Sequence, residues 1–315
     1  MKRNPILSCV LFVALLAVSA NAVEPNSPTT KKTVRLMTIG NSFSNDATAY
    51  LKDIAAADGN LLVLKTANIG GSPMKLHWDR AELHERDPQN KEGIYTAGRG
   101  LKELLSDGPH DFVTMQQRSL SSHDIATYRP YAENLRDYVK KYAPEAELLL
   151  HETWAYRVDD PRFSVTKPVP GEPATQREMY DGLAQAYRTI AAELKVRIIP
   201  AGDAFIAADE NPKWGFKPAA NINLKTINPS ALPDQSRSLH VGYTLKKNDK
   251  GVNTFNMDGH HASPAGRYLG ACVWYEVLFK TSCVGNKFIP AGINADYARY
   301  LQETAHAAVA KLNEK

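Results

Sequence analysis

Residues 33–57 read TVRLMTIGNSFSNDATAYLKDIAAA, and this stretch decides the fold. The apolar run from Val34 to Ile39 ends in Gly40, a pattern typical of a short buried strand that leads into a tight turn. From Asn45 to Ala57 the apolar residues recur at helical spacing. The chain therefore opens as strand, turn and helix, the unit from which parallel α/β sheets are built.

The same alternation continues along the chain. Further strands are expected at residues 60–67, 111–115, 147–150 and 196–200. Helices are expected at residues 99–106, 128–142, 177–194, 263–280 and 295–313. Because strands that alternate with long helices pair in parallel through right-handed crossovers, we predict an α/β fold. It is a three-layer α/β/α sandwich with about five parallel strands and long loops at their carboxyl ends.

Two long segments interrupt this rhythm. Residues 153–175 contain four prolines, and residues 201–257 are rich in Asn, Lys, Pro and Gly. Loops of this length are usually functional. Within the second segment, residues 238–245 and 252–256 flank a turn-rich hexapeptide, which predicts a β-hairpin.

The N-terminus has the pattern of an export signal. Lys2 and Arg3 precede the apolar run 6–18, and Ala20-Asn21-Ala22 is the small-x-small pattern at which signal peptidase cleaves. We predict a signal peptide at 1–22, and export to the periplasm or the extracellular space. The apolar run is too short to span a bilayer, and no integral membrane segment is expected after cleavage. Cys9 leaves lipidation open as an alternative.

The rest of the chain is expected to be a disordered tether, residues 23–32, followed by a single domain at 33–315. The 38 Lys and Arg residues against 34 Asp and Glu are spread along the chain, so no nucleic-acid partner is expected. Cys272 and Cys283 could pair in an oxidising compartment or stay apart, because their spacing alone does not fix the distance between them.

The informative residues follow the strands, because ligands of open parallel sheets collect at the carboxyl ends of the strands. Ser42 follows the first strand and could act as a nucleophile at the start of a helix; the alternative is that it only caps that helix. Gly71 follows the second strand and could present its N–H group to an oxyanion. After the third strand, Gln116 or Gln117 could donate an amide N–H to the same oxyanion.

Asp258 and His261 lie three residues apart at a predicted helix entry. This spacing lets the carboxylate hold one ring nitrogen while the other faces a nucleophile, and His260 would point elsewhere. The competing interpretation is a metal site, for which His151 and Glu152 would have to supply further ligands.

These residues together resemble SGNH hydrolases, the superfamily of GDSL-like esterases. The resemblance lies in Gly-Asn-Ser at 40–42, the glycine after the second strand and D-x-x-H at 258–261, in this order. The details GNSFS, NIGGSP and DGHHASPAG are similar to a branch found in exported bacterial proteins. The third block departs from the family's G-x-N-D pattern, since this chain has Gln116-Gln117-Arg118 there.

The resemblance implies a flavodoxin-like fold and a catalytic triad. Ser42 would be the nucleophile, His261 the base and then the acid, and Asp258 the residue that orients His261. The oxyanion hole would consist of the backbone N–H groups of Ser42 and Gly71 with Gln116 as the side-chain donor, Gln117 being the alternative. No cofactor or metal would be required.

The loops suggest the substrate. Aromatic residues fall after strands or within the long segments, and sugar rings stack on such side chains. They are Trp78, Trp154, Tyr156, Trp214 and Phe216, and Arg118 could bind hydroxyl or carboxylate groups. We therefore expect a carbohydrate O-acetylesterase whose partner is an acetylated polysaccharide or oligosaccharide. The alternatives are a short-chain lipid or aryl esterase and a catalytically silent glycan-binding protein.

Overall fold

The structure is a computed structural model that describes residues 31–164, 169–219, 232–247, 249, 251 and 253–313. The signal peptide predicted for 1–22 and residues 23–30 of the predicted tether lie outside the described residues. The signal peptide, the tether at 23–30 and the lipidation alternative at Cys9 therefore remain predictions. The tether prediction is wrong at Lys32, whose carbonyl oxygen accepts the backbone N–H of Leu61 at 2.8 Å. The described residues between Lys31 and Asn313 belong to one compact unit.

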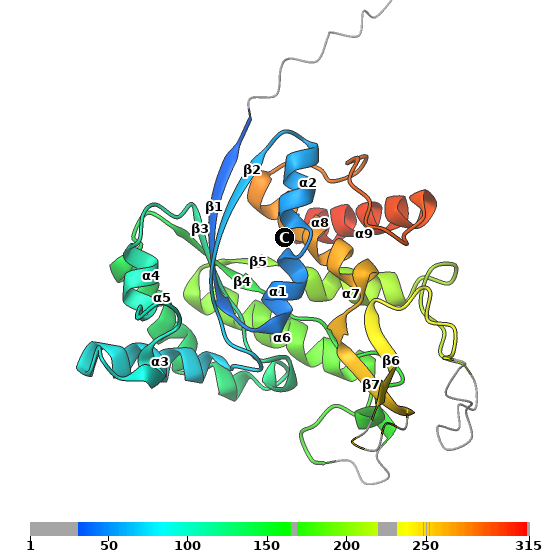
Figure 1. Cartoon of the computed structure of the whole chain (residues 1–315), viewed down its shortest axis with the longest axis horizontal. Helices are drawn as coiled ribbons and strands as arrows, with labels where there is room; N and C mark the ends of the chain where they lie inside the picture. Colours follow the sequence, from blue (N-terminus) through cyan, green and yellow to red (C-terminus); the bar gives the residue numbers. More distant parts are fainter. Residues whose placement is uncertain are drawn as a thin grey trace, which may run out of the picture. The chain divides into compact units, whose positions relative to one another are not determined.

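A five-stranded parallel sheet forms the middle layer, as predicted (Figure 1). Its strands are β1 (Thr33–Gly40), β2 (Leu61–Asn68), β3 (Phe112–Met115), β4 (Glu147–His151) and β5 (Arg197–Ile199). Their order is β2-β1-β3-β4-β5, which is the flavodoxin-like order. From β1 the chain first continues to β2, at one edge of the sheet, and then crosses to β3 on the other side of β1. The carboxyl ends of β1 and β3 therefore mark the switch point where ligands of such sheets bind.

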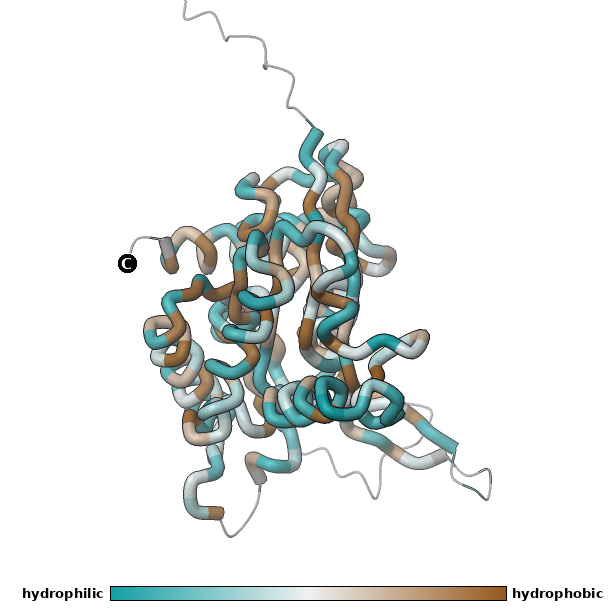
Figure 2. The backbone as a smooth tube through the Cα atoms, turned by 90° about the vertical axis from the view of Figure 1, so that its left-hand side faces the viewer, coloured by the Kyte–Doolittle hydropathy of each residue, from teal (hydrophilic) through white to brown (hydrophobic). Residues whose placement is uncertain are grey.

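Helices cover both faces of this sheet (Figure 1). One layer contains α3 (Met74–Arg86), α4 (Leu101–Ser106), α5 (Tyr131–Tyr142) and α6 (Gln176–Leu194). The other contains α1 (Ser42–Thr48), α2 (Leu51–Ala57), α7 (Ala201–Asp209), α8 (Pro264–Phe279) and α9 (Ala295–Asn313). Hydrophobic and hydrophilic residues alternate along most of the helices in Figure 2. This alternation is expected when one face of each helix packs on the sheet and the other faces solvent. The predicted three-layer α/β/α sandwich is confirmed.

Three local features differ from the sequence-based expectations. The single helix expected at 45–57 is two helices, α1 and α2, separated by a turn at Ala49 and Tyr50. Helix α3 was not predicted, because two of its four buried positions are histidines, His77 and His84. Helix α7 lies within the segment that was expected to be a long irregular loop.

A two-stranded antiparallel sheet stands apart from the main sheet, and it confirms the predicted hairpin. Strand β6 (His240–Lys247) pairs with β7 (Asn253–Ala262). Strand β7 extends further than expected and includes Asp258 and His261, which were placed at a helix entry. The helix begins only at Pro264 of α8, after Ser263 has capped it.

The core includes an aromatic stack at the carboxyl edge of the sheet. Trp154 is fully buried between Phe43 and Phe205, with ring centroids 4.3 Å and 4.4 Å away. Its indole Nε1 donates a hydrogen bond to the carbonyl oxygen of His260 at 2.9 Å. Trp154 therefore joins α1, α7 and the end of β7.

The two cysteines outside the predicted signal peptide, Cys272 and Cys283, are free thiols, and both are buried. Of the two alternatives for this pair, the structure has the unpaired one. Within the described part of the chain, none of the helices has both the length and the apolar composition that crossing a membrane requires.

Replacing Trp154 should reveal its structural role. We expect Trp154→Ala to lower the free energy of unfolding by about 3–5 kcal/mol, since it empties a fully buried aromatic site. Urea unfolding followed by circular dichroism measures the change. Trp78→Ala is the matched control, because Trp78 is only partly buried, and it should cost clearly less. Equal losses in both variants would contradict the core role of Trp154.

Candidate active site

Ser42 is the first residue of α1, directly after β1. The helix is capped by Asn41, whose side-chain oxygen accepts the backbone N–H of Phe43 at 3.0 Å. The alternative that Ser42 merely caps the helix is therefore wrong, and its hydroxyl is available for other contacts. The turn requires Gly40, because a methyl group there would lie 2.6 Å from Ser44 Oγ and 2.7 Å from Gln116 Oε1.

The hydroxyl of Ser42 is one end of a hydrogen-bonded chain of three side chains. Its Oγ lies 2.9 Å from His261 Nε2, and His261 Nδ1 lies 2.9 Å from Asp258 Oδ2. Asp258 Oδ1 also accepts the backbone N–H of His261 at 3.0 Å. Since the carboxylate accepts a hydrogen bond from Nδ1–H, Nε2 is left to accept the proton of Ser42. Two segments 219 residues apart in the sequence thus meet at one point.

The electrostatics of this chain favour a charged Asp258 and a basic His261. Burial opposes the charge on Asp258, but the hydrogen bonds from His261 and the charges of both neighbouring imidazoles outweigh it. Together they hold the pKa of the Asp258 carboxyl well below its usual range. The hydrogen bond to Asp258 in turn raises the pKa of His261 above 6.5, against the effect of burial.

A second carboxylate, Asp46, anchors the strand end that carries His261. Asp46 lies one helical turn after Ser42 in α1 and is buried. Its Oδ2 accepts the backbone N–H of Ala262 at 2.9 Å, and its Oδ1 accepts Nε of Arg267 at 2.9 Å. Burial raises the pKa of Asp46, whereas these two hydrogen bonds lower it. Sequence reasoning missed this residue, because nothing in its local pattern distinguishes it from a surface carboxylate.

The loop that carries Gly71 is held by a buried polar network. Ser72 Oγ donates to the carbonyl oxygen of Gly40 at 3.0 Å and lies 2.8 Å from His77 Nε2. His77 Nδ1 lies 2.7 Å from the hydroxyl of Tyr95. Burial lowers the pKa of His77 to about 4, so the ring is neutral at neutral pH. Gly71 has a φ of 65°, a left-handed conformation that favours glycine.

The prediction that Gln116 donates to an oxyanion is wrong. Its side chain is buried, its Nε2 donates to Asn41 Oδ1 at 2.9 Å, and its Oε1 accepts the hydroxyl of Ser44. The alternative, Gln117, is equally occupied, because its Nε2 donates to the carbonyl oxygen of Thr127 at 2.8 Å. Neither glutamine lines the cavity at Ser42. Both instead hold the loop after β3 in place, so neither amide group is free to contact an oxyanion.

The Ser42–His261 pair lies at a cavity of about 160 Å³. The residues that line it are Asn41, Ser42, Phe43, Gly71, Arg118, Ser119, Leu120, Tyr156, Arg162, His260 and His261. We call this cavity the serine cleft. It holds three of the sequence-predicted contact residues: Gly71, Arg118 and Tyr156. Arg162 and Leu120 were not foreseen.

Of the five aromatic residues expected to contact a substrate, only Tyr156 lines the serine cleft, whereas Trp78, Trp154, Trp214 and Phe216 do not. Trp154 lies within the core stack and is inaccessible to a ligand. Trp78 belongs to α3 and packs edge-on against Tyr138 of α5, with ring centroids 6.1 Å apart, and it does not line the serine cleft. The spacing of aromatic residues in loops could not distinguish packing from exposure.

His260 does not point away from the site, contrary to expectation. Its Nδ1 lies 3.2 Å from Asp258 Oδ1, and its ring packs on His261 with centroids 4.2 Å apart. Asp258, His260 and His261 therefore form a group of metal-ligand type. The metal interpretation that adds His151 and Glu152 is wrong, since His151 faces Gln116 at 3.2 Å and Glu152 accepts the backbone N–H of Asp203.

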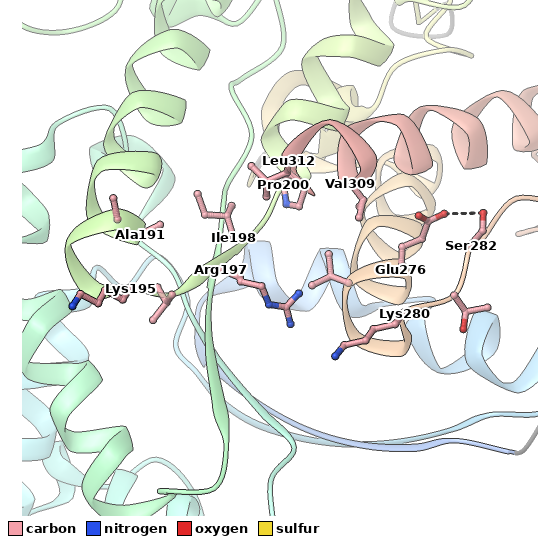
Figure 3. A pocket seen from close by; sticks show the side chains of 14 residues that line it. Ala191, Lys195, Arg197, Ile198, Pro200, Glu276, Lys280, Ser282, Val309 and Leu312 are labelled. Atoms are coloured by element: carbon pink, nitrogen blue, oxygen red, sulfur yellow. Dashed lines mark hydrogen bonds between the residues drawn. The ribbon is translucent and has the colours of Figure 1, made fainter. Parts of the chain in front are cut away.

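Two further cavities help to define the site. An apolar cavity of about 180 Å³ adjoins the serine cleft and shares Leu120, Tyr156 and Arg162 with it. A larger cavity of about 780 Å³, shown in Figure 3, lies elsewhere, between α6, β5, α8 and α9. Arg197 and Glu276 are among the residues that line it, but no member of the Ser42–His261–Asp258 chain does. The volume of a cavity alone would therefore not identify the one that contains the Ser42–His261 pair.

Comparisons with known proteins agree with this fold. The family model described as Domain of unknown function (DUF4886) matches residues 35–211. A crystal structure of a DUF4886 family protein from Bacteroides uniformis is 23% identical, with a TM-score of 0.66 over 88% of this chain and 95% of that chain. No curated protein matches the sequence.

Two further solved structures are similar at lower scores. One, from Slackia heliotrinireducens and described as a candidate SGNH hydrolase, is 20% identical, with a TM-score of 0.48 over 78% of this chain and 98% of that chain. The other, from Parabacteroides merdae and described as a candidate GDSL-like lipase, is 14% identical, with a TM-score of 0.47 over 80% of this chain and 98% of that chain.

The coupling between Asp258 and His261 can be measured directly. An NMR titration of the imidazole signals should give His261 a pKa above 6.5, the ordinary value for histidine. In Asp258→Asn the pKa of His261 should fall, because the hydrogen bond and charge that favour the protonated ring are lost. Asp53→Asn, which alters an exposed carboxyl group on α2, is the matched control. An unchanged His261 pKa in Asp258→Asn would contradict the arrangement.

Proposed function

We propose that this chain, which belongs to the DUF4886 family of domains of unknown function, is a serine esterase of the SGNH type. The observation that carries the proposal is the continuous hydrogen-bonded chain from Ser42 through His261 to Asp258 at the mouth of the serine cleft. It lies at the switch point of the sheet, where ligands of such folds bind. A serine, a histidine and a carboxylate in this geometry are suited to acyl transfer.

In the proposed acylation step, Ser42 Oγ attacks the carbonyl carbon of an ester. Its proton passes to His261 Nε2, and the carbonyl electrons move onto the oxygen. Asp258 stabilises the imidazolium that forms. When the intermediate collapses, the bond from carbon to the alcohol oxygen breaks, and the alcohol leaves with the proton from His261. The product is an acyl group attached to Ser42.

In the second step, water takes the place of the alcohol. His261 Nε2 accepts a proton from water as its oxygen attacks the acyl carbon, and the proton returns to Ser42 when the acid is released. The oxyanion formed in both steps would be stabilised by the backbone N–H groups of Ser42 and Gly71. Without a side-chain donor from Gln116, the oxyanion would be stabilised by these two backbone groups alone.

The small size of the serine cleft supports a short acyl group. Its volume of about 160 Å³ suits an acetyl ester better than a long acyl chain. The lining includes Arg118, Arg162 and His260, which are groups that can donate hydrogen bonds to hydroxyl or carboxylate groups. We therefore propose carbohydrate O-acetylesterase activity on acetylated polysaccharide or oligosaccharide. The exported location predicted from residues 1–22 would bring the enzyme to such substrates.

A second candidate function is favoured by the adjoining apolar cavity. Leu120, Phe163, Val169 and Met179 line it together with Tyr156. An ester with a short alkyl or aryl group could place that group there. The short-chain lipid or aryl esterase therefore remains the alternative. A silent glycan-binding protein has less support, because binding alone does not require the Ser42–His261–Asp258 hydrogen bonds.

Ser42→Ala should abolish esterase activity while leaving the fold intact. We expect the kcat for p-nitrophenyl acetate to fall by roughly 10⁴–10⁶-fold, since the acyl acceptor is lost. Ser119→Ala, which removes another hydroxyl from the lining of the same cleft, is the matched control and should retain most of the rate. If Ser42→Ala retains wild-type activity, the proposed nucleophile is wrong.

The acyl chain length separates the two candidate functions. We expect kcat/KM to be highest for p-nitrophenyl acetate and to fall through butyrate to octanoate, because the serine cleft is small. Release of acetate from acetylated xylan or pectin would then identify the carbohydrate activity. A maximum at butyrate or octanoate, with no acetate released from glycans, would instead favour the lipid or aryl esterase.

A further inference from the structure

We infer that the serine cleft takes acetyl esters whose substrate carries a carboxylate group close to the scissile ester, as in acidic sugar units. This inference rests on the proposed esterase function and adds the charge of the substrate to it. The argument depends on two arginines, Arg118 and Arg162, which line the same cavity as Ser42 and His261. We call them the arginine pair.

Arg118 enters the cleft from the loop after β3. Its backbone is fixed, because its N–H group donates to Gln117 Oε1 at 2.9 Å, while its side chain is exposed. Among the described residues, its guanidinium group forms neither a salt bridge nor a hydrogen bond with the protein. An exposed cation held at the edge of a cavity without an internal partner is available for an anionic ligand.

Arg162 enters the cleft from a different segment, the short helical turn Pro161–Ser164 that follows β4. Its guanidinium carbon lies 4.7 Å from the centroid of the Tyr156 ring, which holds the side chain against the cavity wall. Its side chain is 47% exposed. Its ion-pair partner, Asp160, places Oδ1 4.0 Å from Nε, and the same oxygen accepts the backbone N–H of Arg162 at 3.0 Å. The outer face of the guanidinium group is therefore left for a ligand.

Apart from Asp160, whose Oδ1 lies 4.0 Å from Arg162 Nε, the carboxylates near the cleft are engaged by groups other than the arginine pair. Asp258 is engaged by His261, Asp46 by Arg267 and Asp159 by Arg157. Glu172 lines the adjoining apolar cavity, where it lies 3.8 Å from His123, and not the serine cleft. The internal residues outside the described ranges include no Asp or Glu. The cleft therefore presents two guanidinium groups in the same lining as the nucleophile.

Guanidinium groups are matched to carboxylates in shape and charge. Each presents paired N–H donors that can bind both carboxylate oxygens. Two such groups beside one serine can bind an acidic substrate and orient its ester toward Ser42. A neutral acetyl ester lacks this contact. The expected result is a preference for anionic over neutral esters of the same size.

The preference can be tested with two esters that differ in charge. The anionic probe is para-acetoxybenzoate, and the neutral probe is para-acetoxybenzamide. We expect kcat/KM, corrected for the reactivity of each ester with hydroxide, to be higher for the anion by roughly 10-fold. Raising the salt concentration from about 0.05 M to about 0.5 M should reduce that ratio, because salt screens the attraction.

Substitution of each arginine tests whether the arginine pair is the source of the preference for the anionic ester. Arg118→Gln and Arg162→Gln should each lower the ratio of anionic to neutral kcat/KM by roughly 3- to 10-fold. Arg299→Gln is the matched control, since it removes an exposed arginine on α9, and it should leave the ratio unchanged. A variant that only disturbs the fold would lower both rates alike and leave the ratio unaltered.

The outcomes separate this inference from the proposed function. If the wild type hydrolyses both esters with no preference for the anion, the inference is overturned and the esterase function stands. If the preference survives in Arg118→Gln and in Arg162→Gln, the arginine pair is not its source and the inference is also overturned. If neither ester is hydrolysed faster than by Ser42→Ala, the proposed function fails and the inference fails with it.

Discussion

The buried carboxylate of Asp46 connects the two parts of the chain that meet at the site. It lies in α1, one turn after Ser42, and accepts the backbone N–H of Ala262, the residue that follows His261. The same carboxylate binds Arg267 in α8. Because one buried group fixes both the helix of the serine and the strand end of the histidine, their separation of 2.9 Å is set by the fold and not by the two side chains alone.

The surrounding structure reinforces this connection with packing and polar contacts. Trp154 fills the space beneath the site, between Phe43 and Phe205, and holds the carbonyl group of His260. Gln116 was expected to take part in catalysis, but its side chain joins the loop after β3 to the loop after β1 by donating a hydrogen bond to Asn41. Residues that sequence reasoning assigned to substrate contact thus support the residues that face the cleft. The charge presented to a substrate comes from Arg118 and Arg162 instead.

The sheet could be predicted from the sequence because each strand is a short apolar run followed by a turn residue. Helix α3 could not, because its buried face includes His77 and His84, which hydropathy counts as polar. His77 is buried because Ser72 and Tyr95 satisfy its ring nitrogens. Such partners come from distant positions in the chain, and no local pattern reveals them.

The sequence by itself determined the order of strands, turns and helices along the chain. It also determined that Ser42, Asp258 and His261 are the candidate residues of the site. These follow from local rules, since strand ends, tight turns and a three-residue spacing are all short-range features. Only the tertiary structure decided which side chains face the cleft. Trp154 is enclosed, His260 turns inward and Arg162 reaches the site, because packing and burial are settled by contacts between segments that are far apart in the sequence.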